Sequence, residues 1–283
     1  MAILTVSSRP KDSATRKYSC PRECGLPYWS RGLIPGTGAV TEVVHVLSSM
    51  ATRLVLADLA AEASARHGMD VRVTSLGGVE AARRVREGHG GDVVVLAEDA
   101  VAALAADGHL TEQGIRPLFR SEVAVAAASQ GSTADVGTTD GLRRALRESA
   151  RIAYSTGPSG EGLLALLRSW GMWDEVAERL VQAPPGVPVG TLLLEGRADL
   201  GFQQLSELKE VDGIEVLGLM PPGAEITTVF AGAVLAWSSR PVAARAVLDG
   251  FGARGAAPLV RSRGMELVET PVGTTPEADK TPS

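Results

Sequence analysis

The sequence lacks several features that mark common kinds of functional site. Cysteine occurs only twice in 283 residues, at Cys20 and Cys24, so most of the chain has no thiol for redox chemistry or thiolate catalysis. Their CxxxC spacing has no second pair and no nearby histidine, which argues against a zinc site. The four histidines form no HxxxH motif and there is no GxSxG motif, which disfavours metal hydrolases and Ser-His-Asp hydrolases. We therefore predict no metal and no other cofactor.

The chain also has no excess of basic charge and no long hydrophobic run. The formal net charge is −5, which argues against a nucleic-acid partner, because phosphate binding needs a basic surface. No apolar run is long enough to span a bilayer, so we predict no membrane insertion. Aromatic residues make up only 4% of the chain, yet 45% of residues are hydrophobic, which is enough for a sizeable core in one or two domains.

The two ends of the chain differ in composition from the rest. Residues 1–39 open with a short apolar stretch, MAILTV, and polar residues, proline and glycine interrupt everything after it. A secretory signal needs a longer uninterrupted apolar segment. We therefore predict disordered tails at 1–39 and 268–283 and a cytoplasmic location. A periplasmic or extracellular location is expected only if translation starts elsewhere.

Between these ends, strand patterns alternate with helix patterns, which predicts an α/β architecture. Strands are predicted at 42–47, 70–76, 91–98, 121–129, 151–156, 198–204, 213–220 and 226–236. Helices are predicted at 51–67, 79–87, 99–106, 139–148, 160–170, 173–181, 188–196, 241–251 and 256–263.

Three predicted strand-to-helix junctions combine hydroxyl groups with glycines: LSSMAT (47–52), TSLGGVE (74–80) and YSTGPSGEG (154–162). A helix amino terminus presents unpaired N–H donors and a positive dipole end, so each junction could hold an anion. The candidate ligand-binding residues are Ser48, Ser49, Ser75, Gly77, Gly78, Ser155, Thr156, Gly157, Ser159 and Gly160. The alternative is ordinary helix N-capping, for which Ser48, Ser49, Ser75, Thr156 and Ser159 are equally suited.

Two adjacent glutamines, Gln203 and Gln204, end the predicted strand at 198–204. Burying their amides is costly unless both find hydrogen-bond partners. Because successive side chains of a strand point to opposite faces, at most one of the two is expected to point into a cleft.

The order of several segments, including VLSS, VTSLGGVEAARR, IAYSTGPSGEG, GRADLGFQQLSEL and TTVFAGAVLA, resembles the molybdate-binding-protein-like branch of type II periplasmic solute-binding proteins. The resemblance covers residues 42–267. It implies two α/β lobes joined by two crossing strands, with a ligand cleft between the lobes at helix amino termini. Lobe one would hold 42–122 and 230–267, and lobe two 123–229. The implied ligand positions are Ser48 or Ser49, Ser75–Gly78, Ser155–Gly160 and Gln203–Gln204.

The chain departs from this branch at FQQLSEL, where molybdate receptors carry a tyrosine-containing VYxTDA-like segment. This departure argues against molybdate. Aconitate isomerase also resembles the branch, which suggests a cytoplasmic isomerase that shifts an allylic proton of an unsaturated di- or tricarboxylate. The alternative hypothesis is a binding protein that delivers a carboxylate or oxyanion to an ABC permease. Both hypotheses predict a small anionic ligand.

An isomerase of this kind needs a positioned base. Glu161, within YSTGPSGEG, is the first candidate for this catalytic role. A carboxylate in the first turn of a helix is also favoured by the helix dipole alone, so a purely structural role is the alternative. Glu207 and Glu80 are weaker candidates.

Overall fold

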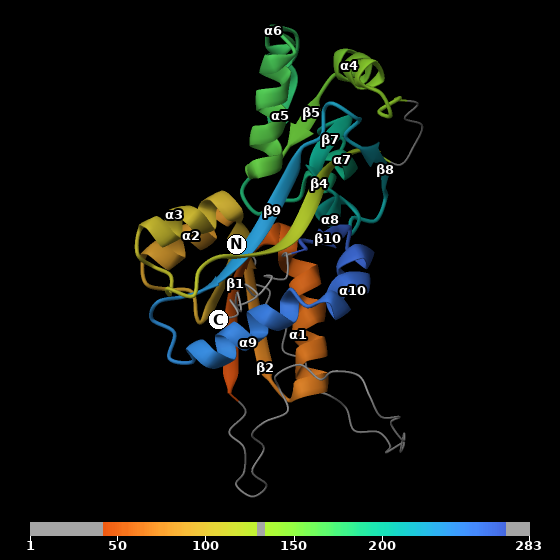
Figure 1. Cartoon of the computed structure of the whole chain (residues 1–283). Coiled ribbons are helices and arrows are strands. Elements are labelled where there is room, and N and C mark those ends of the chain that lie inside the picture. Colours follow the sequence, from red (N-terminus) through yellow and green to blue (C-terminus); the bar gives the residue numbers. More distant parts are fainter. Residues whose placement is uncertain (1–41, 129–133, 270–283) are drawn as a thin grey trace, which may run out of the picture.

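The computed structural model of the chain describes residues 42–128 and 134–269, which form two α/β lobes (Figure 1). The predicted tail at 1–39 lies outside the described residues. Of the predicted tail at 268–283, only Val268 and Glu269 are described, and the Val268 N–H donates to the Leu118 carbonyl at 3.0 Å. No helix within the described ranges is long and apolar enough to cross a membrane.

Lobe one is a sheet with helices on both faces. Its strands β1 (Val43–Ser49), β2 (Asp70–Leu76) and β3 (Val93–Ala97) are parallel, in the order β2-β1-β3, and β9 (Thr227–Val234) runs antiparallel to β3. One core packs one face against α1 (Arg53–His67), α9 (Pro241–Phe251) and α10 (Ala257–Ser262). A second core packs the other face against α2 (Gly78–Arg86) and α3 (Glu98–Ala106).

Because helices cover both faces of the sheet, its central strands are apolar on both sides. The first four residues of β3, VVVL, are fully buried, as expected of a strand that has helices on both faces. Successive β1 residues pack into different cores: Val44 and Val46 face α1, whereas Leu47 faces α2 and α3. The short 3₁₀ turns η2 (Met50–Thr52) and η4 (Arg254–Ala256) precede α1 and α10.

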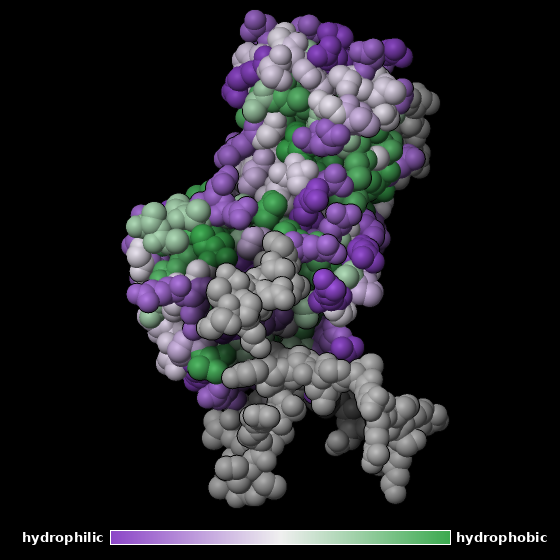
Figure 2. All heavy atoms as spheres, in the orientation of Figure 1, coloured by the Kyte–Doolittle hydropathy of each residue, from purple (hydrophilic) through white to green (hydrophobic). Residues whose placement is uncertain are grey.

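Lobe two is built on the far half of β4 (Arg116–Ala128). The sheet continues from β4 to β7 (Leu200–Gln204), β5 (Ile152–Tyr154) and β6 (Leu180–Gln182), while β8 (Ile214–Leu219) pairs with β4. One face packs on α4 (Thr139–Glu148), α5 (Pro158–Ser169) and α6 (Trp173–Val176). The other face packs on α7 (Val189–Leu194) and α8 (Leu205–Leu208). Figure 2 shows hydrophilic side chains over the top of this lobe.

Two chain segments join the lobes side by side. Residues Arg116–Glu122 of β4 pair with β9 of lobe one, whereas Val123–Ala127 pair with β7 of lobe two. The second segment, 220–226, leads from β8 to β9 along the same strand. The Met220 N–H donates to the Val123 carbonyl at 3.1 Å, and the Val123 N–H donates to the Ile226 carbonyl at 2.9 Å.

Several elements differ from the sequence prediction. Strand β4 begins at Arg116 rather than at residue 121, because pairing with β9 extends it through a segment that contains Pro117. The helix predicted at 173–181 is wrong in its second half. There α6 gives way to the 3₁₀ turn η3 (Ala177–Arg179) and to β6, whose pairing with β5 overrides the local pattern. Strand β10 (Met265–Leu267), paired with β4, and helix α8 were not predicted.

Candidate functional site

In lobe one, the predicted hydroxyl groups converge at the ends of two neighbouring strands. Ser48 and Ser75 are register partners on β1 and β2, and their Oγ atoms lie 2.8 Å apart in a shared hydrogen bond. Ser49 follows Ser48, and its Oγ lies 3.4 Å from Thr52 Oγ1 in the turn η2. The structure thus joins the first two junctions through their serines.

In lobe two, the third junction has a similar pair. Ser155, just after β5, and Ser159, in the first turn of α5, place their Oγ atoms 2.7 Å apart. Ser159 is buried, and Ser155 Oγ also accepts from the Gly157 N–H at 3.4 Å. Thr156 is half-buried and makes no hydrogen bond within the described ranges.

Helix capping does not explain these hydroxyl groups. The N-cap positions of η2, α1, α2 and α5 are Ser49, Thr52, Gly77 and Gly157, and none of them makes a side-chain capping bond. The chain does cap a helix elsewhere, because Thr138 Oγ1 accepts from the Gly141 N–H at 3.0 Å at the start of α4. The helix starts at the three junctions therefore keep N–H donors that no capping side chain uses.

The glycines of the junctions fall into two groups. A Cβ on Gly160 would lie 1.9 Å from the Ser155 carbonyl oxygen, so packing requires glycine there. A Cβ on Gly77, Gly78 or Gly157 would meet nothing within 4 Å, and none of these three residues has a positive φ. Neither packing nor backbone conformation requires glycine at these three positions. The missing side chains leave the helix starts uncovered, which suits the close approach of a ligand.

The two lobes meet close to these junctions. Ser206 Oγ of α8 donates to the Ala51 carbonyl of η2 at 3.1 Å, which ties lobe two to the turn before α1. The first turns of α5 pack on the segment that leads into β9, where a Cβ on Gly162 would lie 2.5 Å from Ile226 Cγ2. Figure 1 shows α1 and α5 starting at the ends of their lobes that face each other.

The two glutamines point to opposite faces, as their strand position predicts. Gln203 Oε1 accepts from the Val189 N–H, and its Nε2 donates to Glu207 Oε1, both at 2.8 Å. Gln204 Nε2 donates to Thr228 Oγ1 at 2.8 Å, but its buried Oε1 has no partner among the described residues. Both ends of the Gln203 amide are therefore occupied by hydrogen bonds within the protein, whereas the amide oxygen of Gln204 remains a free acceptor among the described residues.

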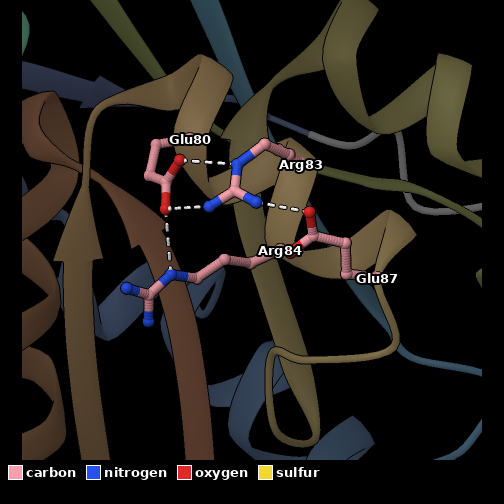
Figure 3. A network of polar contacts seen from close by, with 4 residues as sticks. All are labelled: Glu80, Arg83, Arg84 and Glu87. Atoms are coloured by element: carbon pink, nitrogen blue, oxygen red, sulfur yellow. Dashed lines mark hydrogen bonds and ion pairs between the residues drawn. The ribbon is translucent and has the colours of Figure 1, made fainter.

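The three candidate carboxyl groups differ sharply in environment. Glu161 is exposed in the first turn of α5, and its carboxylate makes no hydrogen bond or ion pair within the described ranges. Glu80 is bound by Arg83 at 2.8 Å and by Arg84 Nε at 3.2 Å, while Arg83 also binds Glu87 (Figure 3). The hydrogen bond from Arg83, with that from Arg84, lowers the pKa of Glu80 to about 2, which makes Glu80 a weak base.

Glu207 is the carboxyl group whose proton affinity suits acid–base work. Burial raises the pKa of Glu207 to about 7, although the Gln203 hydrogen bond and the charge of Arg53 act to lower it. A general base works best when its pKa lies near the operating pH. The Gln203 amide, itself fixed by the Val189 N–H, holds the Glu207 carboxyl in place.

Other features of the surface lie away from the junctions. Within 42–128 and 134–269, no three His, Cys, Asp or Glu side chains gather as a metal site would require. One hollow lies beside β4 and β10 and includes Arg120 and Arg261, and a second lies at the outer end of lobe two and includes Arg144 and Asp199. No residue of the three junctions lines either hollow.

Comparison with known protein families adds the decisive observation. A family model described as bacterial extracellular solute-binding protein matches residues 44–266. The chain belongs to this family. This membership confirms the resemblance identified from the junction motifs and from the order of segments around them.

Relatives of this solute-binding family member include an enzyme. A protein from Pseudomonas sp. named aconitate isomerase is 33% identical over 177 residues, which cover 62% of this chain and 68% of the relative.

Solved structures confirm the periplasmic-binding-protein fold. The periplasmic molybdate-binding protein of Azotobacter vinelandii has a TM-score of 0.68 at 19% identity, covering 80% of this chain and all of that chain. The sulfate-binding protein of Mycobacterium tuberculosis H37Rv has a TM-score of 0.63 at 17% identity, covering 80% of this chain and 87% of that chain. Identities this low establish the fold alone.

Several partners in the site of this family member were not predicted. The N–H of Val189 and the hydroxyl of Thr228 hold the two glutamines, and both come from elements distant in sequence. Glu207 was ranked below Glu161, because its environment depends on burial that the sequence does not display. No spacing rule gave a signal for the bond between Gln203 and Glu207, because Gln203 ends strand β7 and Glu207 lies in the short helix α8 that follows it.

Proposed function

We propose that this protein binds a small unsaturated di- or tricarboxylate, such as aconitate, at the three junctions and isomerises it by an allylic proton shift. The observation that carries the proposal is the set of helix starts that have no capping side chain and open glycines at Gly77, Gly78 and Gly157. Such starts offer uncharged donors to carboxylates. The relative named aconitate isomerase supports the unsaturated tricarboxylate as ligand class.

The proposed reaction moves one proton and changes no oxidation state. A base removes a proton from the carbon next to the C=C bond, and the electron pair of that C–H bond forms the new double bond. The π electrons of the old double bond shift into the adjacent carboxylate, which gives a dienolate. An acid then returns a proton to the carbon of the old double bond that is farther from the site of deprotonation. Donors placed where this negative charge develops lower the barrier, because they bind the transition state more strongly than the substrate.

We assign the base first to Glu207 and second to Glu161. Glu207 accepts a hydrogen bond from Gln203. The preceding residue, Ser206, donates to the Ala51 carbonyl of η2, which places this part of α8 beside that turn. Glu161 also lies at a junction, but no side chain within the described ranges holds it.

Ligand binding and turnover can be measured separately. A thermal-shift screen with molybdate, tungstate, sulfate, phosphate, citrate and cis- and trans-aconitate reports binding, because a ligand of the folded state raises the melting temperature. Proton NMR in D₂O with any carboxylate that binds then reports isomerisation or exchange. A shift with molybdate or tungstate alone would reject the isomerase.

The second candidate function is a binding protein that delivers an anion to an ABC permease. The family description, extracellular solute-binding protein, favours it, as do the molybdate- and sulfate-binding proteins of the same fold. This function predicts tight binding without turnover, and a location outside the cytoplasm. For the isomerase, we propose the cytoplasmic location predicted from the sequence.

A further inference from the structure

Helix α8 belongs to lobe two, yet two separate elements of lobe one hold it. The Ser206 Oγ, within the helix, donates to the Ala51 carbonyl of η2 at 3.1 Å. Just after the helix, the Lys209 Nζ donates to the Ser262 carbonyl at the end of α10 at 2.8 Å. Figure 1 shows α8 beside β10, where the two lobes meet. A helix of four residues is too short to be stable by itself, so the position of α8 depends on contacts of this kind.

Arg263, which follows Ser262, bridges the two lobes with one guanidinium group. Its Nε donates to Asp58 Oδ2 of α1 at 2.6 Å, and its Nη1 donates to Glu210 Oε1, just beyond α8, at 2.9 Å. The Asp58 bond lies within lobe one and fixes the arginine, whereas the Glu210 bond crosses to lobe two. The three side chains are only 30% to 34% exposed, so water and salt screen this bridge less than a fully exposed ion pair.

Glu207 lies within the segment that these contacts hold. It comes directly after Ser206 and two residues before Lys209, and Gln203 donates to its Oε1 at 2.8 Å. The charge of Arg53, the first residue of α1, acts on the Glu207 carboxyl, so this carboxyl lies near lobe one. Contact between α8 and lobe one therefore helps to bury Glu207, and this burial raises its pKa. Neither the three residues of the bridge nor the charged residues on the strands packed against α8 form a hydrogen bond or ion pair with Glu207 in the described part of the chain; those on the strands are Arg116, Arg120 and Glu122 of β4 and Glu215 of β8.

We propose that Arg263 and Glu210 are positioning residues: their ion pair between the lobes holds α8 on lobe one and so keeps the Glu207 carboxyl in place near the start of α1. When the pair is broken, α8 is free to move away from η2, and water reaches Glu207. The carboxyl then releases its proton at lower pH and no longer has a fixed place from which to act as a base. This inference rests on the proposed function for the role of Glu207 as the base, but the burial of Glu207 can be measured without turnover.

The experiment follows the titration of Glu207 by ¹³C NMR in protein labelled at the glutamate carboxyl carbons, with Glu207→Gln to identify the resonance. The midpoint should lie at about pH 7 in the wild type and fall by about half a pH unit or more in both Arg263→Ala and Glu210→Ala. The two variants remove charges of opposite sign, so direct charge effects alone would move the midpoint up in Arg263→Ala and down in Glu210→Ala.

Arg147→Ala is the matched control, because Arg147 Nε donates to Glu175 Oε2 at 2.8 Å in an ion pair that lies within lobe two. Its midpoint should equal that of the wild type. Melting temperatures, measured in parallel, show which variants are folded. Glu210→Ala keeps the bond between Arg263 and Asp58, so it decides the test if Arg263→Ala does not fold.

The outcomes separate this inference from the proposed function. A wild-type midpoint in the folded variants, or shifts of opposite sign in the two, would overturn the positioning role. A midpoint near pH 4.5 in the wild type itself would also overturn it, because Glu207 would then not be buried by α8. If Glu207 is the base, the acid side of the pH profile of cis-aconitate turnover moves to lower pH in both variants. A wild type that binds cis-aconitate without turnover would overturn the isomerase, while the NMR titration still decides whether the ion pair positions Glu207.

Discussion

At the scale of single residues, a side chain can bind a ligand only with hydrogen-bonding atoms that are not already used inside the protein. Gln203 has both ends of its amide occupied, whereas Gln204 has one end free. Sequence position predicted that they face opposite ways, but not which one keeps a free atom. That difference comes from the Val189 N–H and from Thr228, which tertiary packing brings to them.

Glu207 should make stability depend on pH. Its pKa is about 7 in the folded protein and close to 4.5 in the unfolded chain, so the folded state holds its proton to higher pH. Its favourable contribution is complete below pH 4.5 and is lost as pH rises through 7. From pH 4.5 to 8, the free energy of unfolding of the wild type should fall relative to Glu207→Gln by up to about 3 kcal/mol. Urea unfolding of both proteins across this pH range measures the two free energies of unfolding. A difference between them that does not change with pH would contradict the raised pKa of Glu207.

Glu207 should also control turnover. Replacing it with Gln keeps the shape of the side chain and removes the base, so turnover of cis-aconitate should fall at least a hundredfold while binding persists. Glu161→Gln is the comparison, and its turnover should stay near that of the wild type. A loss of turnover in Glu161→Gln alone would transfer the role of base to Glu161.

At the scale of elements, regular periodicity was enough for most helices and strands. The bounds of β2, α4 and α9 were predicted to the residue, because their apolar patterns are clear and their ends are marked by turn residues. Helix α8 and strand β10 were missed, since elements of four and three residues are too short to show a period. The junctions were found because hydroxyl and glycine residues cluster there, but the Ser48–Ser75 and Ser155–Ser159 bonds depend on register and packing.

The open start of α5 gives a direct test at this scale. Gly157→Ala adds a Cβ that meets no protein atom, so the free energy of unfolding should change by less than about 1 kcal/mol. The same Cβ would cover the helix start, so affinity for cis-aconitate should fall about tenfold or more. Calorimetric titration measures that affinity.

Gly250→Ala in α9 is the matched control, because Gly250 is equally open and belongs to none of the three junctions. It should bind cis-aconitate as the wild type does. Equal affinity in Gly157→Ala and Gly250→Ala would remove the α5 start from the binding site.

At the scale of the whole molecule, the two-lobed fold positions the site but does not decide between turnover and transport. The family and the fold were predicted from the order of motifs and are confirmed. The cytoplasmic location was predicted from residues 1–39, which lie outside the described residues, and it stays a prediction. The choice between the two functions therefore rests on chemistry at the junctions.

The most direct measurement is proton NMR of cis-aconitate incubated with the purified protein in D₂O. If the protein is the isomerase proposed above, resonances of trans-aconitate appear, and deuterium enters the carbon that receives the returning proton. Unchanged cis-aconitate, in a sample where calorimetry shows that the ligand is bound, would contradict the isomerase and favour the binding protein.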